Sequence, residues 1–258
     1  MSKIQIIARA LAPAIAIAAA LTCGGAATAA SLNEDFAKLP GFASKGWTQQ
    51  NNSTAPGAEP DWVQGEDSFP FIAHSGAANS YLTVNYASVS DGDGPDTISN
   101  WLISPIMSFN NGDVVSFYTK TELRSESQGF FPDRLQLRFS KASGLNVGTN
   151  PGDVGTFTTL LLDVNPTLAL QGQPGAYPTS WTQYTGQILG LNAPTNGAIA
   201  FRYFVTDGGP GGSNSNSIAV DSLSIAPGVA PVPEPAAYLM MALGLGVIGL
   251  RRMRATRG

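Results

Sequence analysis

The chain has 258 residues, of which 43% are hydrophobic and only 12% are charged, with a single cysteine and a formal net charge of −4. The negative charge argues against nucleic-acid binding, which depends on basic surfaces, and one cysteine excludes an internal disulfide or a thiolate metal site. The length is enough for one all-β domain with a sizeable core, or for two small domains at most.

The first thirty residues have the pattern of a secretory signal peptide. Lys3 and Arg9 form a positive region, residues 10–21 are an apolar stretch, and Ala27-Thr28-Ala29 fits the small-residue rule of signal peptidase. The alternative, a buried N-terminal helix, is disfavoured because the segment has no polar face. We therefore predict an N-terminal signal helix over 1–30, which directs the chain into the Sec export machinery and is then removed by signal peptidase.

Residues 31–226 are predicted to form a folded domain made of short strands. Leu135, Leu137 and Phe139 alternate with polar residues, which is the period of two of a half-buried strand. Turns rich in Gly, Asn, Asp and Pro separate such segments, and no sustained helical stripe occurs between them. The predicted fold is therefore all-β, a jelly-roll β-sandwich of two sheets, with strands near 81–86, 114–119, 134–140, 157–163, 199–206 and 218–225.

This domain is more acidic than the whole chain. Residues 31–233 carry 8 Lys and Arg against 17 Asp and Glu, a net charge of −9, which basic residues at both ends of the chain mask. An acidic surface keeps an exported protein soluble and favours cations over polyanions. No nucleic-acid partner is therefore expected.

The first and last segments of the domain carry acidic residues in unusual positions. In an extended strand Glu34 shares a face with Leu32 and Phe36, so its carboxylate points toward the core and needs a partner. In the last strand the apolar positions change phase after Val220. That change predicts a β-bulge at Asp221-Ser222, which re-aims the side chains around it.

Candidate sites for chemistry in the domain are few. His74 is the only histidine, and its neighbour Ser75 does not complete a catalytic triad, because adjacency in sequence does not place a base against a nucleophile. The acidic loop 91–96 lacks the glycine and glutamate positions of an EF-hand. Trp62 lies in a polar segment and is predicted to be exposed, so it is our candidate for stacking on a sugar ring. No catalytic residue is predicted.

The carboxyl-terminal residues 232–258 have three parts. The motif Pro233-Glu234-Pro235 follows a Pro-rich stalk at 227–232, and fifteen uncharged residues, 236–250, come next. As a helix this run reaches about 22 Å, short of the hydrocarbon core of roughly 30 Å, so its flanking residues are needed to span a membrane. A cytoplasmic C-terminus, with the folded domain outside, is favoured by the arginine cluster Arg251, Arg252 and Arg254.

This order of motif, short transmembrane helix and arginine cluster resembles the PEP-CTERM sorting signal. The resemblance implies sorting by an exosortase, a membrane transpeptidase that cuts at the motif and discards the helix. It also implies a transient stay in the inner membrane, followed by a place on the surface, or in the extracellular matrix, of a Gram-negative bacterium that makes exopolysaccharide. The alternative is a plain membrane anchor.

Several short motifs are spread over nearly the whole folded domain. They include Asn33-Glu34-Asp35-Phe36, Gly46-Trp47, Phe69-Pro70, His74-Ser75-Gly76, Ile98 to Pro105, Phe131 to Leu135, Ala200 to Val205 and Ile218-Ala219-Val220-Asp221. Together they resemble the choice-of-anchor J domain, which is similar to the cleaved-adhesin jelly rolls of secreted bacterial proteins. The resemblance implies a fold and a location and assigns no activity.

The same resemblance implies a structural Ca²⁺ where the first and last strands meet. Its implied ligands are Glu34, with Asp35 as an alternative, and Asp221. The competing interpretation is a salt bridge, for example from the acidic residue to Arg202, or simple exposure of the carboxylates.

The sequence therefore favours a non-enzymatic structural or adhesion module that is exported, sorted by an exosortase and held within exopolysaccharide or a biofilm. A calcium-dependent, lectin-like carbohydrate-binding module is the first alternative. A glycoside-active enzyme is the second, because 17 acidic residues leave many Asp/Glu pairs open and none stands out.

Overall fold

The computed structural model describes residues 31–57, 62–90 and 96–228. The predicted signal peptide, the sorting motif and the arginine cluster lie outside these ranges. No helix within them has the length and apolar character to cross a membrane. The regular elements described are strands and the short 3₁₀ turns η1 (Leu39–Gly41), η2 (Ala43–Lys45), η3 (Tyr86–Ser88) and η4 (Glu126–Gln128).

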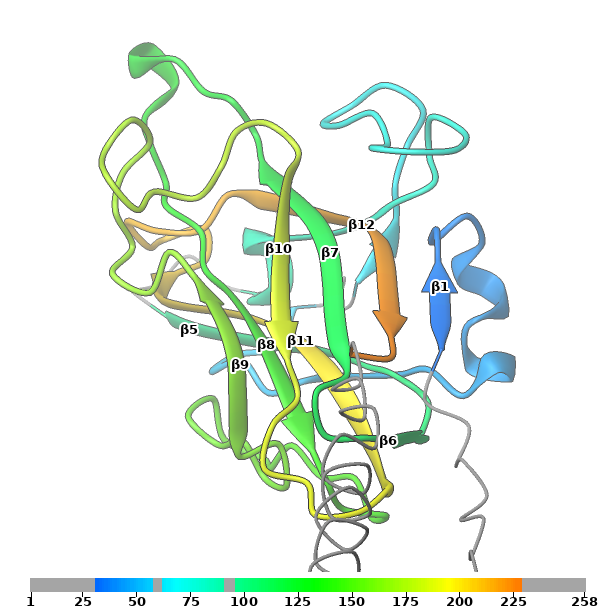
Figure 1. Cartoon of the computed structure of the whole chain (residues 1–258). Helices are drawn as coiled ribbons and strands as arrows, with labels where there is room; N and C mark the ends of the chain where they lie inside the picture. Colours follow the sequence, from blue (N-terminus) through cyan, green and yellow to red (C-terminus); the bar gives the residue numbers. More distant parts are fainter. Residues whose placement is uncertain (1–30, 58–61, 91–95, 229–258) are drawn as a thin grey trace, which may run out of the picture.

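The strands form two antiparallel sheets packed face to face (Figure 1). The first sheet has the order β10 (Thr182–Gln187), β7 (Val114–Thr121), β12 (Ser217–Ala226), β4 (Leu82–Asn85) and β3 (Val63–Gln64), and β12 also pairs with β1 (Leu32–Glu34). The second sheet has the order β2 (Thr48–Asn51), β5 (Asp96–Ile103), β11 (Thr195–Gly208), β8 (Leu135–Ser140) and β9 (Thr159–Val164), and β11 also pairs with β6 (Met107–Phe109).

Eight of these strands have the order of a jelly roll. One layer is β4-β12-β7-β10 and the other is β5-β11-β8-β9, so the chain repeatedly passes from one layer to the other. The first of the eight strands pairs with the last, as two interlocked Greek keys require. The all-β jelly-roll sandwich predicted from the sequence is confirmed.

The core lies between the layers and follows the predicted alternation. In β8, Leu135, Leu137 and Phe139 point inward and are buried, and β7 contributes the buried Phe117. The ring of Phe117 meets that of Phe201 on β11 edge to face, with centroids 4.9 Å apart. Each such side chain stabilises the fold by about 1.5–3 kcal/mol when fully buried, so the contact between layers holds the sandwich together.

The segment 96–103, which becomes β5, was not among the strands predicted from alternation. Its residues from Ile98 to Ile103 are all buried. The outer face of β5 is covered by Val147 and Phe157 from the loop after β8, and the Phe157 ring lies 5.8 Å from that of Trp101. A strand buried on both faces shows no alternation of polar and apolar residues, so a period of two could not identify β5 in the sequence.

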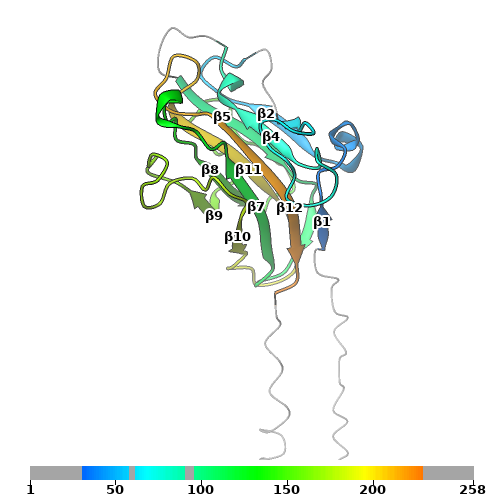
Figure 2. The same ribbon diagram turned by 90° about the horizontal axis from the view of Figure 1, so that it is seen from above.

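The two ends of the sandwich differ in what they carry. Leu32 pairs with Ile225, so the chain enters and leaves the domain at one end. The loops after β4 and β7 and the loop before β12 lie at the opposite end, because Asn85 and Ser217 are paired there. Figure 2 shows this arrangement along the length of the strands. We call the end with these loops the distal end.

Candidate functional site

The distal end is hollowed by two open depressions of about 420 and 400 Å³. Both are lined by Tyr86, Arg124 and Asn216, so they adjoin, and we call them together the distal groove. These residues follow β4, follow β7 and precede β12, respectively. Because β12 lies between β4 and β7 in the first sheet, the three strand ends meet at one place.

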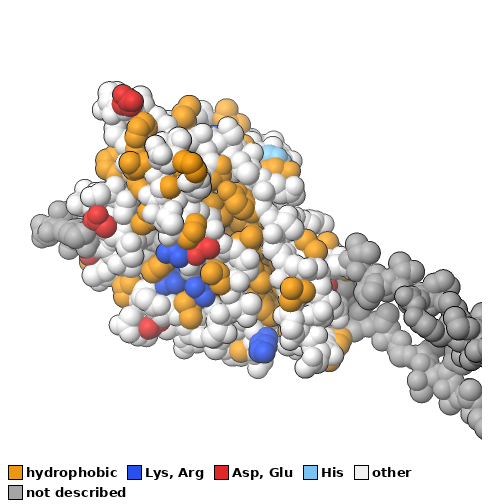
Figure 3. All heavy atoms as spheres, turned by 60° about the vertical axis from the view of Figure 1, so that its left-hand side comes forward, with side chains coloured by type: hydrophobic (Ala, Val, Ile, Leu, Met, Phe, Trp, Pro, Cys, Tyr) orange, Lys and Arg blue, Asp and Glu red, His pale blue; other side chains and the backbone are white. Residues whose placement is uncertain are grey.

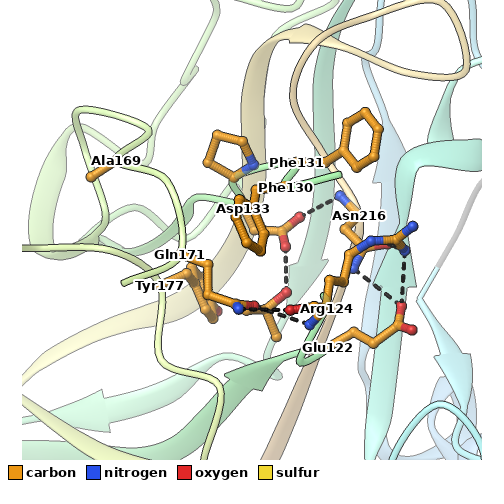
Figure 4. Close-up of a pocket in the computed structure, with 11 residues that line it drawn as sticks. Glu122, Arg124, Phe130, Phe131, Asp133, Ala169, Gln171, Tyr177 and Asn216 are labelled. Atoms are coloured by element: carbon orange, nitrogen blue, oxygen red, sulfur yellow. Dashed lines mark hydrogen bonds and ion pairs between the residues drawn. The ribbon is translucent and has the colours of Figure 1, made fainter. Parts of the chain in front are cut away.

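A closed set of polar contacts forms the centre of the groove. Arg124 Nη1 donates to Asn216 Oδ1 at 3.1 Å and forms an ion pair with Glu122 Oε2 at 3.5 Å. Asn216 Nδ2 donates to the same Glu122 oxygen at 3.1 Å. Figure 4 shows the three side chains turned toward one another. Charge-assisted hydrogen bonds of this kind hold planar groups in fixed directions, which is what recognition of hydroxyl groups requires.

Exposed aromatic side chains flank this polar centre. Phe69, Tyr86 and Phe131 are 67%, 45% and 37% exposed, although large aromatic residues are usually mostly buried. The guanidinium of Arg124 lies 5.4 Å from the centre of the Phe131 ring. An aromatic face beside fixed polar groups suits a ligand with an apolar ring face and a polar rim, such as a sugar.

A buried carboxylate supports the groove from below. Asp133 is fully buried, and its Oδ1 accepts hydrogen bonds from the Asn216 backbone N–H at 2.8 Å and the Tyr203 hydroxyl at 2.5 Å. Its Oδ2 accepts from the Thr121 hydroxyl at 2.5 Å. Burial raises the pKa of Asp133, and these three donors partly offset the rise. The carboxylate therefore fixes the backbone of Asn216.

A cavity of about 20 Å³ opens beside Asp133, between Arg124, Gln171 and Tyr177 (Figure 4). That volume holds about one water molecule. It is too small for a sugar ring.

The predicted inward position of Glu34 is confirmed, and the residue has a partner. Its side chain is 6% exposed, and Oε2 lies 3.0 Å from Lys45 Nζ. Oε1 accepts a hydrogen bond from the Phe36 backbone N–H at 3.2 Å. The partner is therefore Lys45 and not Arg202, while the neighbouring Asp35 is exposed and accepts a hydrogen bond from the backbone N–H of Ala37.

The predicted bulge in the last strand is also confirmed. The register of β12 against β7 shifts between Asp221 and Ser224, and Ser222 has a φ of 52°. The buried Asp221 accepts hydrogen bonds from the backbone N–H groups of His74 at 2.7 Å and Ser75 at 3.1 Å. Burial raises the pKa of Asp221. Its carboxylate thus ties the loop after β3 to the outer face of β12.

These contacts leave little of either carboxylate for a metal ion. Lys45 occupies one side of Glu34, and Asp221 faces N–H donors from His74, Ser75 and Ser222. Within the part of the chain that the structure describes, no three His, Cys, Asp or Glu side chains gather as a metal site. The calcium site at Glu34, Asp35 and Asp221 stays a prediction that rests on the sequence resemblance.

Trp62 and His74, which the sequence analysis considered for sugar stacking and for catalysis, have structural contacts. Trp62 is 1% exposed, so its predicted exposure is wrong: the ring enters the core, with its centroid 6.3 Å from that of Phe201. The imidazole of His74 stacks on Tyr118 at 3.6 Å, and its Nδ1 lies 3.0 Å from Ser222 Oγ. Asp221 accepts a hydrogen bond from the backbone of His74 and not from its ring. Ser222, His74 and Asp221 therefore do not have the geometry of a catalytic triad.

The groove residues themselves were not identified from the sequence. Glu122 and Arg124 follow the predicted strand 114–119 closely, and this was the only local signal for them. Their pairing with Asn216, 92 or more residues further along the chain, requires the strand order.

Comparison with known proteins identifies the sorting signal. Residues 231–255 match the family described as the PEP-CTERM protein-sorting motif, which confirms the prediction for this segment. The match indicates an exported protein that an exosortase sorts to the cell surface. No curated protein matches the chain.

Solved structures of similar fold are adhesin and carbohydrate-binding domains. The K1 and K3 cleaved adhesin domains of Lys-gingipain from Porphyromonas gingivalis W83 have identities of 22% and 20%, and TM-scores of 0.48 and 0.46. Each comparison covers 77% of this chain, with 98% of K1 and 100% of K3. The family 11 carbohydrate-binding module of the cellulase Lic26A-Cel5E from Clostridium thermocellum has 12% identity and a TM-score of 0.34, over 79% of this chain and 97% of the module.

At these identities and TM-scores, the similarity carries no argument about function. The chain therefore combines an exosortase-read surface-sorting signal with a β-sandwich domain.

Proposed function

We propose that this protein is a non-enzymatic adhesion module of the choice-of-anchor J type, held on the surface or in the extracellular matrix of an exopolysaccharide-producing Gram-negative bacterium. The supporting observation is the polarity of the domain. The chain leaves the sandwich at Ala226, a few residues before the sorting motif, whereas the distal groove lies at the opposite end. A domain attached in this way presents its groove away from the envelope.

Sorting is tested by mass spectrometry of the protein extracted from the surface of its native host. We expect a mature N-terminus near Ser31 and a mature C-terminus near Pro235, as signal peptidase and exosortase cleavage would leave them. An intact Arg254 on the surface protein would instead support a plain membrane anchor. Recovery of the uncut chain from the cytosol would overturn the proposal.

Carbohydrate binding in the distal groove is the second candidate function. It is favoured by the exposed rings of Tyr86, Phe69 and Phe131 around the fixed Glu122–Arg124–Asn216 contacts. The lectin-like form of this candidate includes a structural calcium ion at the predicted ligands, which would have to displace Lys45 from Glu34. The ligand is expected to be an uncharged glycan, because the guanidinium of Arg124 is already engaged by Glu122.

Tyr86→Ala is expected to weaken glycan binding about tenfold, since it removes one stacking surface. The measurement is a glycan array with and without calcium, followed by titration calorimetry on the best ligand. Leu189→Ala is the matched control, because Leu189 is 61% exposed and lies outside the groove. Equal affinities of the two variants would exclude the groove as the binding site.

Incubation of the same glycans with the protein examines the enzymatic alternative. Glu66 and Glu122 both line the groove, but the Glu122 carboxylate is already engaged by Arg124 and Asn216. We expect no new reducing ends when glycans are incubated with the protein. Reducing ends that disappear in Glu122→Gln would support a glycoside-active enzyme instead.

A further inference from the structure

The outer face of the second sheet carries a connected group of arginines. Arg134, immediately before β8, and Arg138 within it are partly exposed, in phase with Gln136 and out of phase with the core residues of the strand. On the neighbouring strand β11, Arg202 pairs in register with Gln136. Arg134, Arg138 and Arg202 therefore lie on one face, which we call the arginine face.

Hydrogen bonds join the three side chains into one network. Arg134 forms two hydrogen bonds to the carboxylate of Asp163, at 2.8 Å from Nε and 2.6 Å from Nη2. Gln136 Nε2 donates to the same carboxylate at 3.1 Å. The Gln136 oxygen in turn accepts from Arg138 Nε at 2.8 Å and Arg202 Nη1 at 3.3 Å.

The network holds more positive charge than negative. The Asp163 carboxylate forms an ion pair with Arg134, and among the described residues neither Arg138 nor Arg202 forms an ion pair. Arg202 is 1% exposed and lies against aromatic rings, 3.8 Å from the centre of Phe204. Burial lowers the pKa of both Arg202 and Arg138, and the charges of Asp153 and Asp163 near Arg202, and of Asp163 near Arg138, oppose this only in part. An added anion would therefore stabilise this face.

Two of the arginines can reach such an anion. Arg134 and Arg138 are partly exposed, and no hydrogen bond within the described ranges uses Nη1 of Arg134 or Nη2 of Arg138. Figure 3 looks onto the side of the molecule where β9 lies in Figure 1, and it shows Lys and Arg side chains gathered around an acidic one among hydrophobic neighbours. Leu160 on β9, opposite Arg138 in register, is 45% exposed and adds an apolar surface.

We propose that the arginine face binds the carboxylate or sulfate groups of an acidic polysaccharide. The site lies on a different sheet from the distal groove and does not depend on it. Nη1 of Arg134 and Nη2 of Arg138 can each donate to an anionic group, and the apolar Leu160 beside them suits the sugar rings between those groups. The net charge of −9 over residues 31–233 disfavours nucleic acid as the ligand.

The proposal is tested by titrating the protein with polygalacturonate as the carboxylate probe and dextran sulfate as the sulfate probe. Arg138→Gln is expected to weaken binding of the preferred probe about tenfold and to reduce the salt dependence by about one counterion. Arg138→Lys keeps the charge, and its affinity is expected to lie between that of the unmodified protein and that of Arg138→Gln. Lys38→Gln removes the same charge from an exposed residue outside the face, and it should bind like the unmodified protein.

Several outcomes would overturn the proposal. They are equal binding by Arg138→Gln and Lys38→Gln, binding of neutral dextran as tight as that of the charged probes, and binding of duplex DNA as tight as that of polygalacturonate. A melting temperature of Arg138→Gln within a few degrees of the unmodified protein confirms that the variant is folded. Tyr86→Ala should leave polygalacturonate binding unchanged, which separates this face from the groove.

Discussion

Asp133→Ala is expected to lower the free energy of unfolding by about 3–5 kcal/mol, a large part of the stability of a domain of this size. The substitution leaves the Tyr203 hydroxyl and the Asn216 N–H without their buried acceptor, whereas the Thr121 hydroxyl retains the Ser217 carbonyl oxygen. Each such donor costs about 1–3 kcal/mol. Glycan affinity should fall as well, because Asn216 loses the bond that fixes its backbone in the groove.

Asp133→Asn is the control that keeps the shape of the side chain. Its oxygen can accept from Tyr203 and Asn216, and its NH₂ can donate to Thr121, whose hydroxyl also reaches the Ser217 carbonyl oxygen at 2.9 Å. We therefore expect Asp133→Asn to be clearly more stable than Asp133→Ala. Urea denaturation of the two variants and the unmodified protein measures the difference.

The pH dependence of this comparison has a definite sign. Because burial raises the pKa of Asp133 in the folded state, the folded protein binds a proton more tightly than the unfolded chain does. The resulting stabilisation is complete below the ordinary pKa of 3.8 and is lost as the pH rises through the raised value. The unmodified protein should therefore gain stability relative to Asp133→Asn as the pH falls through the raised pKa toward 3.8. A difference that stays constant over this range would contradict the assignment, since the raised pKa of Asp221 is common to both proteins.

Arg202→Ala is expected to cost about 3 kcal/mol of unfolding free energy, the second largest effect. The side chain fills a buried site between aromatic rings, with its guanidinium 3.8 Å from the centre of Phe204 and 4.8 Å from that of Trp101. Truncation leaves a cavity there. It also removes the hydrogen bonds to Ser99 at 3.0 Å and to the Pro151 carbonyl oxygen.

Arg202→Met distinguishes packing from charge. Methionine keeps most of the volume and removes a buried cation that has no ion pair among the described residues, and such a replacement is often close to neutral. We therefore expect Arg202→Met to recover most of the stability lost in Arg202→Ala, as measured by chemical denaturation. If both variants are equally unstable, the hydrogen bonds of the guanidinium matter more than its contact with the rings.

Local patterns in the sequence determined the export and sorting signals of the protein and several features of its strands. The apolar run after Lys3 and Arg9 predicts export, and residues 231–255 carry the sorting motif. The alternation of β8 and the phase change at Asp221 predicted an inward face and a bulge that the structure confirms. These features depend on the chemistry of neighbouring residues along one strand or helix, so a short window of sequence is enough to predict them.

The tertiary structure alone decided where the distal groove and the arginine face lie. Trp62 has polar neighbours in sequence, but its ring packs in the core between the sheets. Arg124 meets Asn216 only because β12 lies beside β7, and Arg202 joins Arg138 only because β11 lies beside β8. Such contacts are fixed by the order and register of strands that are far apart in the chain, and no local period carries that information.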